Sequence, residues 1–524
     1  MDTIKFVLVF VLFIQVYGAN AKIDESSDNN FTVINYHLDS SNFSSQIIKT
    51  TDDFIKLKLP GVNYQQIIGR PELPMLNVLL ITENHHKNGE DIIIEKNKVK
   101  FTRDGRLSFF KGQKCRCRQI EDFQFDEKIY NSNQQDFWVE DFGDYRGKKV
   151  LRLNVVLGKQ NERSFELTTG IQIKIPKHYK KLDTQIYLND KKRSRSTLII
   201  GKIEYRKLLN SYVDRMKTMG RNGIIEFIDT KVETQTIKEL INKHYNSNGI
   251  DNVILVGNDQ IIPTYYVDTK FDSQTPSDYQ YGLMGGEEDM IPDVFISRLP
   301  ISNKKQLSNV LSKFKVLGEG LNIKRLLGIS SNEGSNPSDF EYMRSIINPL
   351  SKSRSASALF LDQDNLNSNR DSFNSELQNG VDFISYIGHG SGFSWPSFND
   401  EYVISDLELV DDQKRFPVLI DIACQNGRFS GEGRIGENFF LGGDDNRLVG
   451  ASLYYGGSVD ISWHPPAVMT VGISEFISSN NNVPIDKALT YGHFYLMNTS
   501  TPKEDIIDNL EWYHLQGDPG IIIL

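Results

Sequence analysis

Two apolar segments of this sequence end in residues suited to nucleophilic catalysis. Phe383–Ile387 runs directly into a Gly-His-Gly turn at His389, and Val418–Ile422 is followed two residues later by Cys424. Continuous apolar runs of this length are typical of strands buried on both faces, as in a parallel sheet. Parallel strands place their carboxyl ends at one edge, and the intervening residues suffice for one crossover. We therefore expect His389 and Cys424 to lie close together.

This pair of residue types has the chemistry of a cysteine hydrolase. A thiol becomes an effective nucleophile when a neighbouring imidazole accepts its proton, and imidazole titrates in the useful range. The backbone amides of Gly390 and Cys424 are suited to form an oxyanion hole. Each feature alone also has an ordinary structural explanation, since glycine turns follow many strands and cysteine is often simply buried. The joint pattern within one domain favours catalysis.

The elements around these residues divide the chain into two regions. Residues 22–190 contain short alternating runs, such as Phe54–Leu59 and Val150–Leu157, which are typical of an antiparallel β-sandwich. In residues 198–524, apolar strands alternate with helices, which predicts an α/β fold with a mostly parallel sheet and helices on both faces. We expect a subdomain break near residue 325. The basic stretch 191–197 is interpreted as a linker with a processing site or, alternatively, as a plain solvated linker.

The α/β region has a clear order of elements. Helical spacing predicts helices over Thr234–His244, Lys304–Leu317, Ser338–Leu350 and Ala467–Ser478. Apolar runs predict further strands over Leu198–Ile200, Val253–Val256, Arg325–Ile329 and Val449–Tyr454.

The N-terminus and the composition indicate the compartment. Lys5, an apolar run over Phe6–Tyr17 and small residues at Ala19 and Ala21 form a signal peptide over residues 1–21, with a retained membrane anchor as the alternative. Three N-x-[ST] sequons fit a glycosylating secretory route; they lie at Asn30, Asn42 and Asn498. The net charge of −9 and the lack of a basic surface run argue against nucleic acid as a partner. We expect a secreted or lysosomal (endomembrane lumen) protein that has no membrane contact after signal removal.

Cysteine usage is sparse for a secreted protein. The chain has three cysteines, of which Cys115 and Cys117 are too close along one strand to bridge without strain. We therefore expect no disulfide and an unbridged thiol at Cys424, either buried or used in chemistry.

The motifs above resemble those of the gingipain family of cysteine peptidases, in the clan of caspases and legumains. The resemblance covers most of the chain. It is carried by Tyr386–Trp395, Phe416–Phe429, Asp460–Trp463 and Gly517–Pro519, with support from Gly257, Ser277–Gly282 and Pro292–Leu299, and from Gly69–Pro74 in the family's propeptide. It implies a caspase–hemoglobinase-like fold preceded by a β-rich propeptide, and it implies Cys424 and His389 as the dyad.

The same resemblance implies roles for three further residues. Glu333 matches an acid that orients the histidine, with a solvated loop acid as the alternative. Trp463 matches an aromatic residue that lids the primary specificity pocket, with a core tryptophan as the alternative. Asp339 falls near an arginine-binding aspartate, where a buried carboxylate would select a guanidinium. Its alternative role is to cap the N-terminus of the following helix.

The sequence thus predicts a cysteine endopeptidase that is made as a zymogen and cleaves after Arg or Lys. Its partners would be protein or peptide substrates and its own propeptide, and catalysis would need no cofactor. Structural calcium remains open at two acidic loops, around Glu287–Asp289 and Asp444–Asn446, for which solvated turns are the alternative. Two other functions also stay open: an acyl-transferring ligase or transpeptidase, and a catalytically silent binding module.

Overall fold

A computed structural model describes most of the chain. The described residues are 21–38, 47–50, 54–83, 87–96, 100–112, 115, 124–182, 196–228, 232–286, 288–334, 337–431, 433–444 and 447–524. Nearly all of the predicted signal peptide, the sequon at Asn42 and the basic linker up to residue 195 therefore lie outside the described residues. Within the described residues, no helix is both long and apolar enough to cross a membrane.

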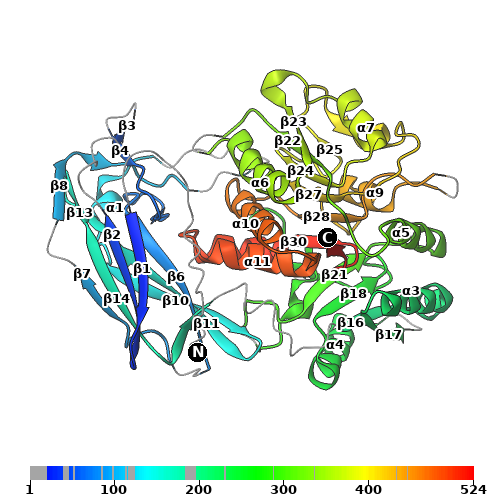
Figure 1. The fold of residues 1–524 in the computed structure, drawn as a ribbon, viewed down its shortest axis with the longest axis horizontal. Helices are drawn as coiled ribbons and strands as arrows, with labels where there is room; N and C mark the ends of the chain where they lie inside the picture. Colours follow the sequence, from blue (N-terminus) through cyan, green and yellow to red (C-terminus); the bar gives the residue numbers. More distant parts are fainter. Residues whose placement is uncertain are drawn as a thin grey trace, which may run out of the picture.

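The N-terminal region is β-rich, as predicted, and lies beside the α/β region (Figure 1). One of its sheets has the order β1-β2-β14-β7, with bounds Ala21–Ser27, Phe31–Leu38, Gly170–Pro176 and Ile93–Lys96. A second has the order β10-β11-β6-β15, with bounds Phe137–Tyr145, Lys148–Val156, Pro74–Thr82 and Tyr179–Lys181. Alternate residues of both sheets form one apolar core, which includes Ile34, Leu80, Leu153 and Ile173. This is the packing that period-two hydrophobic patterns produce.

The α/β region is built on a ten-stranded sheet. Its strand order is β17-β16-β18-β21-β30-β28-β27-β24-β22-β23. The strands of its first half have the bounds Asn222–Ile228, Ser196–Lys202, Asn252–Val256, Phe295–Leu299 and Tyr513–Gln516. Those of its second half have the bounds Leu453–Gly457, Val418–Ile422, Phe383–Ile387, Arg325–Ser330 and Ser357–Asp362.

The two halves of this sheet run in opposite directions. Neighbouring strands are parallel within each half, whereas β28 and β30 are antiparallel, with Gly457 opposite Tyr513. The carboxyl ends of the second-half strands therefore lie at the same edge as the amino ends of the first-half strands. The N-terminal domain contacts both sets of strand ends along this edge.

Helices cover both faces of the sheet, as predicted (Figure 1). One layer contains α6 (Asp339–Arg354), α10 (Pro465–Ser479) and α11 (Ile485–Met497), which pack on one another. The other contains α3 (Arg206–Thr218), α5 (Lys304–Val316) and α9 (Ile435–Leu441).

Most elements of the α/β region form where the sequence predicts them, with one correction there and one in the N-terminal region. The strand predicted over Val449–Tyr454 starts at Leu453, because Gly450 has a φ of 89° and Ala451 donates to the carbonyl of Phe439 instead of to a sheet neighbour. The prediction that the chain has no disulfide is wrong, since Cys115 is disulfide-bonded. Its partner lies outside the described residues.

Candidate active site

The two strands with reactive ends are parallel neighbours, as their sequence predicts. In β24 and β27, Phe383 lies opposite Val418 and Ile387 opposite Ile422. The ladder continues one step further, because Gly388 donates its N–H to the carbonyl of Ile422 over 3.3 Å. His389 and Cys424 each follow two residues after the last register pair, so both leave the sheet at the same level.

The loops after these strands touch at Gly390. A Cβ atom at this position would lie 2.3 Å from the carbonyl oxygen of Cys424 and 2.9 Å from the Cβ of Ala423. A backbone oxygen cannot move far enough to relieve a contact shorter than 3.0 Å, so only glycine fits at residue 390. The Gly-His-Gly turn thus brings the backbone after His389 directly against the backbone of Cys424.

The backbone and ring of His389 are both held in place. Its N–H donates to Ser397 Oγ over 2.9 Å, and its carbonyl accepts from Tyr386 Oη over 2.7 Å. Its Nε2 lies 2.9 Å from Glu333 Oε1. The two side chains remain 34% and 44% exposed, so this contact lies at the protein surface and is not part of the core. A carboxylate on one ring nitrogen fixes the tautomer and the direction of the other nitrogen.

Glu333, Trp463 and Asp339 gather around one loop that follows β22. The ring of Trp463 meets that of His389 edge to face, with centroids 5.7 Å apart. A Cβ at Gly334 would lie 3.1 Å from Trp463 Nε1, and the N–H of Asp339 donates to the carbonyl of Glu333 over 3.0 Å. The structure therefore brings all three residues to the side of His389.

Asp339 is fully buried and begins α6, but it does not cap this helix. The cap is Ser338, whose hydroxyl accepts from the N–H of Glu341 while the Glu341 carboxylate accepts from the N–H of Ser338. The capping alternative for Asp339 is therefore wrong. Its Oδ2 instead accepts from Ser331 Oγ over 2.7 Å.

Cys424 is a fully buried thiol that belongs to no disulfide. Its Sγ accepts from the N–H of Ile461 over 3.3 Å and donates to the Ile461 carbonyl over 4.0 Å. The next residue, Gln425, has a φ of 60°, which an L-residue other than Asn or Asp seldom adopts. Its amide Nε2 donates to Asp460 Oδ1 over 2.7 Å, which helps to hold this tight turn.

Sequence reasoning missed two residues that join the cysteine loop to the histidine loop. Asn426 donates from Nδ2 to Asp421 Oδ2 over 3.1 Å and accepts at Oδ1 from the N–H of Gly392 over 2.9 Å. Asp421 is fully buried in β27 and also accepts from Trp395 Nε1 and Tyr454 Oη. Burial raises the pKa of its carboxyl to about 6. The available signal was an acid inside an otherwise apolar strand.

The N-terminal domain contacts the residues next to this site. Cys115 forms an isolated antiparallel bridge with Ser462, which lies between Ile461 and Trp463. Backbone of the N-terminal domain thus runs directly beside the segment that contacts both the thiol and the His389 ring.

Metal ligands are not concentrated at this site. Among the described residues, no group of three or more His, Cys, Asp or Glu side chains could hold a metal ion. In the acidic loops considered for calcium, Asp289 accepts from the N–H groups of Gly285 and Ile291, as in an ordinary turn. Glu287, Asp445 and Asn446 lie outside the described residues.

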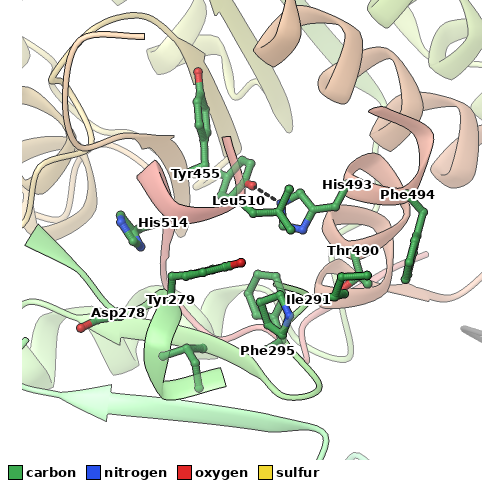
Figure 2. A pocket seen from close by; sticks show the side chains of 13 residues that line it. Asp278, Tyr279, Ile291, Phe295, Tyr455, Thr490, His493, Phe494, Leu510 and His514 are labelled. Carbon is green, nitrogen blue, oxygen red and sulfur yellow. Dashed lines mark hydrogen bonds between the residues drawn. The ribbon is translucent and has the colours of Figure 1, made fainter. Parts of the chain in front are cut away.

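A separate cavity of about 40 Å³ lies between the two halves of the α/β region (Figure 2). Its lining includes Tyr279 and Phe295 from the first half and Tyr455, His493 and His514 from the later elements. Tyr455 Oη and His493 Nε2 are 3.0 Å apart. None of the residues discussed above for catalysis lines this cavity, so it is not the active site.

The fold and the site together define a class: an α/β protein with a thiol and an imidazole at adjacent strand ends. The model of peptidase family C25 matches residues 190–523. The chain belongs to this family, the gingipain family, and is a cysteine peptidase.

Solved structures show the same fold. The crystal structure of the Arg-specific cysteine proteinase gingipain R aligns with a TM-score of 0.55 and 20% identity, over 64% of this chain and 79% of that one. The complex of the pro- and mature domains of Porphyromonas gingivalis RgpB aligns with a TM-score of 0.55 and 20% identity, over 63% of this chain and 79% of that one. A search of curated proteins finds no match.

Proposed function

We propose that the protein is a secreted cysteine endopeptidase in which Cys424 is the nucleophile and His389 the general acid and base. The observation that carries this proposal is the register of β24 and β27, which ends both strands at one level and leaves Gly390 against the Cys424 carbonyl. With Glu333 on Nε2 of His389, the other ring nitrogen is the one that would exchange a proton with the thiol.

The reaction then proceeds in two steps. The Cys424 thiolate attacks the peptide carbonyl carbon, and the amides of Gly390 and Cys424 stabilise the oxyanion. The His389 imidazolium gives its proton to the leaving amine, which departs and leaves an acyl-enzyme. His389 next takes a proton from water, which attacks the thioester and releases the acid and the thiol. This chemistry needs no metal or cofactor.

The N-terminal domain is proposed to be a propeptide that keeps the enzyme latent. Cys424 is fully buried and Cys115 pairs with Ser462 beside it, so a substrate would have to displace this segment. The structure of the RgpB pro- and mature-domain complex supports a propeptide as the partner. Cleavage in the basic linker 191–197 would allow the domain to leave, and the sequons and the N-terminal apolar segment agree with secretion.

A preference for Arg or Lys is the finer part of the proposal. Asp339 is buried beside the cleft, and a carboxylate in this position would pair with a cationic side chain. Trp463, next to His389, would cover the aliphatic part of that side chain. The similar gingipain R is described as Arg-specific.

Peptide cleavage by the processed protein tests this function. The processed parent should cleave a broad peptide library after basic residues, and Cys424→Ala should abolish cleavage. The matched control is Ser308→Ala, at an exposed position of α5, which should cleave as the parent does. If the parent cleaves nothing and Cys424 does not react with an electrophilic peptide, the chain is a silent binding module. Products joined to an added amine would show acyl transfer.

A further inference from the structure

The turn between β10 and β11 contains an arginine, which is a disfavoured residue for a turn of this conformation. Arg146 and Gly147 connect the strands, with φ values of 54° and 74°. A two-residue turn with both φ values positive favours Asn-Gly or Gly-Gly, because a long L side chain is disfavoured in this region. Local hairpin formation therefore does not explain the arginine.

Arg146 instead enters the catalytic domain. Its Nη2 donates to Asp251 Oδ1 over 3.1 Å, and its N–H donates to Asp293 Oδ1. The side chains of Arg146 and Asp251 are only 9% and 5% exposed. The negative charge of Asp486 also stabilises the positive charge of Arg146. Its Oδ1 is buried and has no hydrogen bond among the described residues. We call Asp251, Asp293 and Asp486 the socket.

The rest of the hairpin tip is equally close to the catalytic domain. Tyr145 packs edge to face on Phe494 of α11, with ring centroids 5.1 Å apart. Gly143 approaches the backbone of Glu288, and a Cβ there would lie 2.8 Å from the Glu288 carbonyl oxygen. The tip is therefore inserted between elements of the catalytic domain and does not merely lie on its surface.

A second arginine of the same hairpin adds to this contact. Arg152 in β11 is 2% exposed, and its Nη1 donates to the carbonyl of Met497 at the end of α11 and to those of Thr499 and Thr501 in the loop that follows. Carbonyls at a helix C-terminus lack partners within the helix and attract cations. Both arginines of the hairpin thus donate hydrogen bonds to carboxylate or carbonyl oxygens of the catalytic domain.

The socket is distant from the dyad. Asp251 and Asp293 precede β18 and β21, at the edge of the sheet where Cys424 follows β27. In the strand order, β18 is four positions from β27, which corresponds to about 19 Å. The contact at the cleft itself is an isolated backbone bridge between Cys115 and Ser462.

We propose that the socket is the docking site for the N-terminal domain and holds it independently of the active-site contact. Its partner is an arginine presented at the tip of a tight β-hairpin. This assignment builds on the proposed propeptide role and adds that latency depends on a remote anchor. After the linker is cut, the domain stays bound until Arg146 leaves the socket.

Dissociation of a cut chain tests the anchor. The chain carries Cys424→Ala and a site for a sequence-specific protease inserted within residues 191–195, so the result does not depend on whether the parent is a peptidase. After cutting, the release of the N-terminal domain is timed from the immobilised catalytic domain. Loss of a buried charge pair acts mainly on the dissociation rate, so Arg146→Asn should accelerate release at least about 30-fold.

The choice of asparagine separates binding from folding. Asn-Gly is the preferred pair for this turn, so the released domain should melt at the parent's temperature or above it. Asp251→Asn, which changes only the catalytic domain, should accelerate release similarly. The matched control is Arg106→Asn, which breaks an ion pair with Glu127 inside the N-terminal domain and should leave the rate unchanged. Release at the parent's rate in both Arg146→Asn and Asp251→Asn would overturn the proposal.

Discussion

The two halves of the ten-stranded sheet use charged residues in different ways. In the first half, Arg298 of β21 is 1% exposed and pairs with Asp278, which is 5% exposed. Its guanidinium also donates to the carbonyls of Gly257 and Ile262, so it joins the loop after β18 to the segment that contains Asp278. In the second half, His389 Nε2 lies 2.9 Å from Glu333 Oε1, and the two side chains remain 34% and 44% exposed.

This difference separates charged residues that stabilise the fold from those that take part in the reaction. A buried ion pair with all its donors satisfied fixes loops but cannot exchange protons or meet a substrate. A partly exposed imidazole whose Nε2 is held by a carboxylate can exchange protons and meet a substrate. Substitutions in the first half should therefore change stability, and those in the second half should change catalysis.

The largest expected effect is on catalysis. His389→Ala should lower kcat about 10⁴-fold, because the thiol loses its proton acceptor and the leaving amine its proton donor. The melting temperature should stay close to the parent's, since the ring is partly exposed. Single-turnover kinetics with a cleavable peptide and calorimetry measure the two quantities. An active variant would remove His389 from the mechanism.

Next is the loss of the buried ion pair in the first half. Arg298→Met should lower the free energy of unfolding by about 3–5 kcal/mol, because Asp278 becomes a buried charge without its cation. Denaturant titration measures this change. Any folded fraction should keep the parent's kcat. The matched control is Arg325→Met, whose partner Glu376 is accessible to water and whose loss should cost at most about 1 kcal/mol.

Acid should weaken the region where the halves meet. Burial lowers the pKa of His514 to about 4, below its ordinary value of 6.5. The unfolded chain therefore binds more protons between these values, and the stability present above pH 6.5 is lost as pH falls toward 4. The loss amounts to at most about 3 kcal/mol for this residue. Burial lowers the pKa of His493 in the same cavity to about 4 as well, so this residue should contribute a loss of similar size (Figure 2).

The measurement is denaturant unfolding at a series of pH values for the parent and for His514→Gln. The variant should be less dependent on pH between 6.5 and 4, whatever its stability at neutral pH. An unchanged slope would show that His514 does not titrate in this range.

The acid that holds His389 should have a smaller effect. Glu333→Gln should reduce kcat about 10–100-fold, because the amide still reaches Nε2 but no longer stabilises imidazolium. The basic limb of the kcat/KM profile should move to lower pH, because the imidazolium is the reactive form of the ring and loses the carboxylate that favours it. Glu341→Gln in the capping box of α6 is the matched control and should leave the profile in place.

The smallest expected effect concerns the link between the two catalytic loops. Asn426→Ala should lower kcat about tenfold with little change in KM, because it releases Gly392 and leaves Asp421 with one donor fewer. Steady-state kinetics with the same peptide measure both values. A rise in KM at constant kcat would instead assign Asn426 to substrate binding.

The sequence predicted much of the fold because its signals are local. The strands Phe383–Ile387 and Val418–Ile422 form over those residues, since continuous apolar runs specify burial on both faces. The start of β28 was predicted too early, at Val449. Gly450 has a positive φ and Ala451 donates to Phe439, so the loop before the strand extends past these residues. The disulfide of Cys115 was missed because close spacing along one strand was taken to preclude a bridge.

The sequence by itself determined the two-region architecture and the strands that lead to His389 and Cys424. It also determined the glycine at residue 390, where the two loops touch. Periodicity and chain order encode these properties directly. Only the tertiary structure decided which groups meet. Arg152 and Asn154 alternate along β11 as solvent-facing residues would, yet they are buried at the catalytic domain and beside Glu140. Likewise, Asp421 meets Trp395, Tyr454 and Asn426. A residue's own neighbours in sequence specify whether it is buried, but its partners come from segments that only folding brings together.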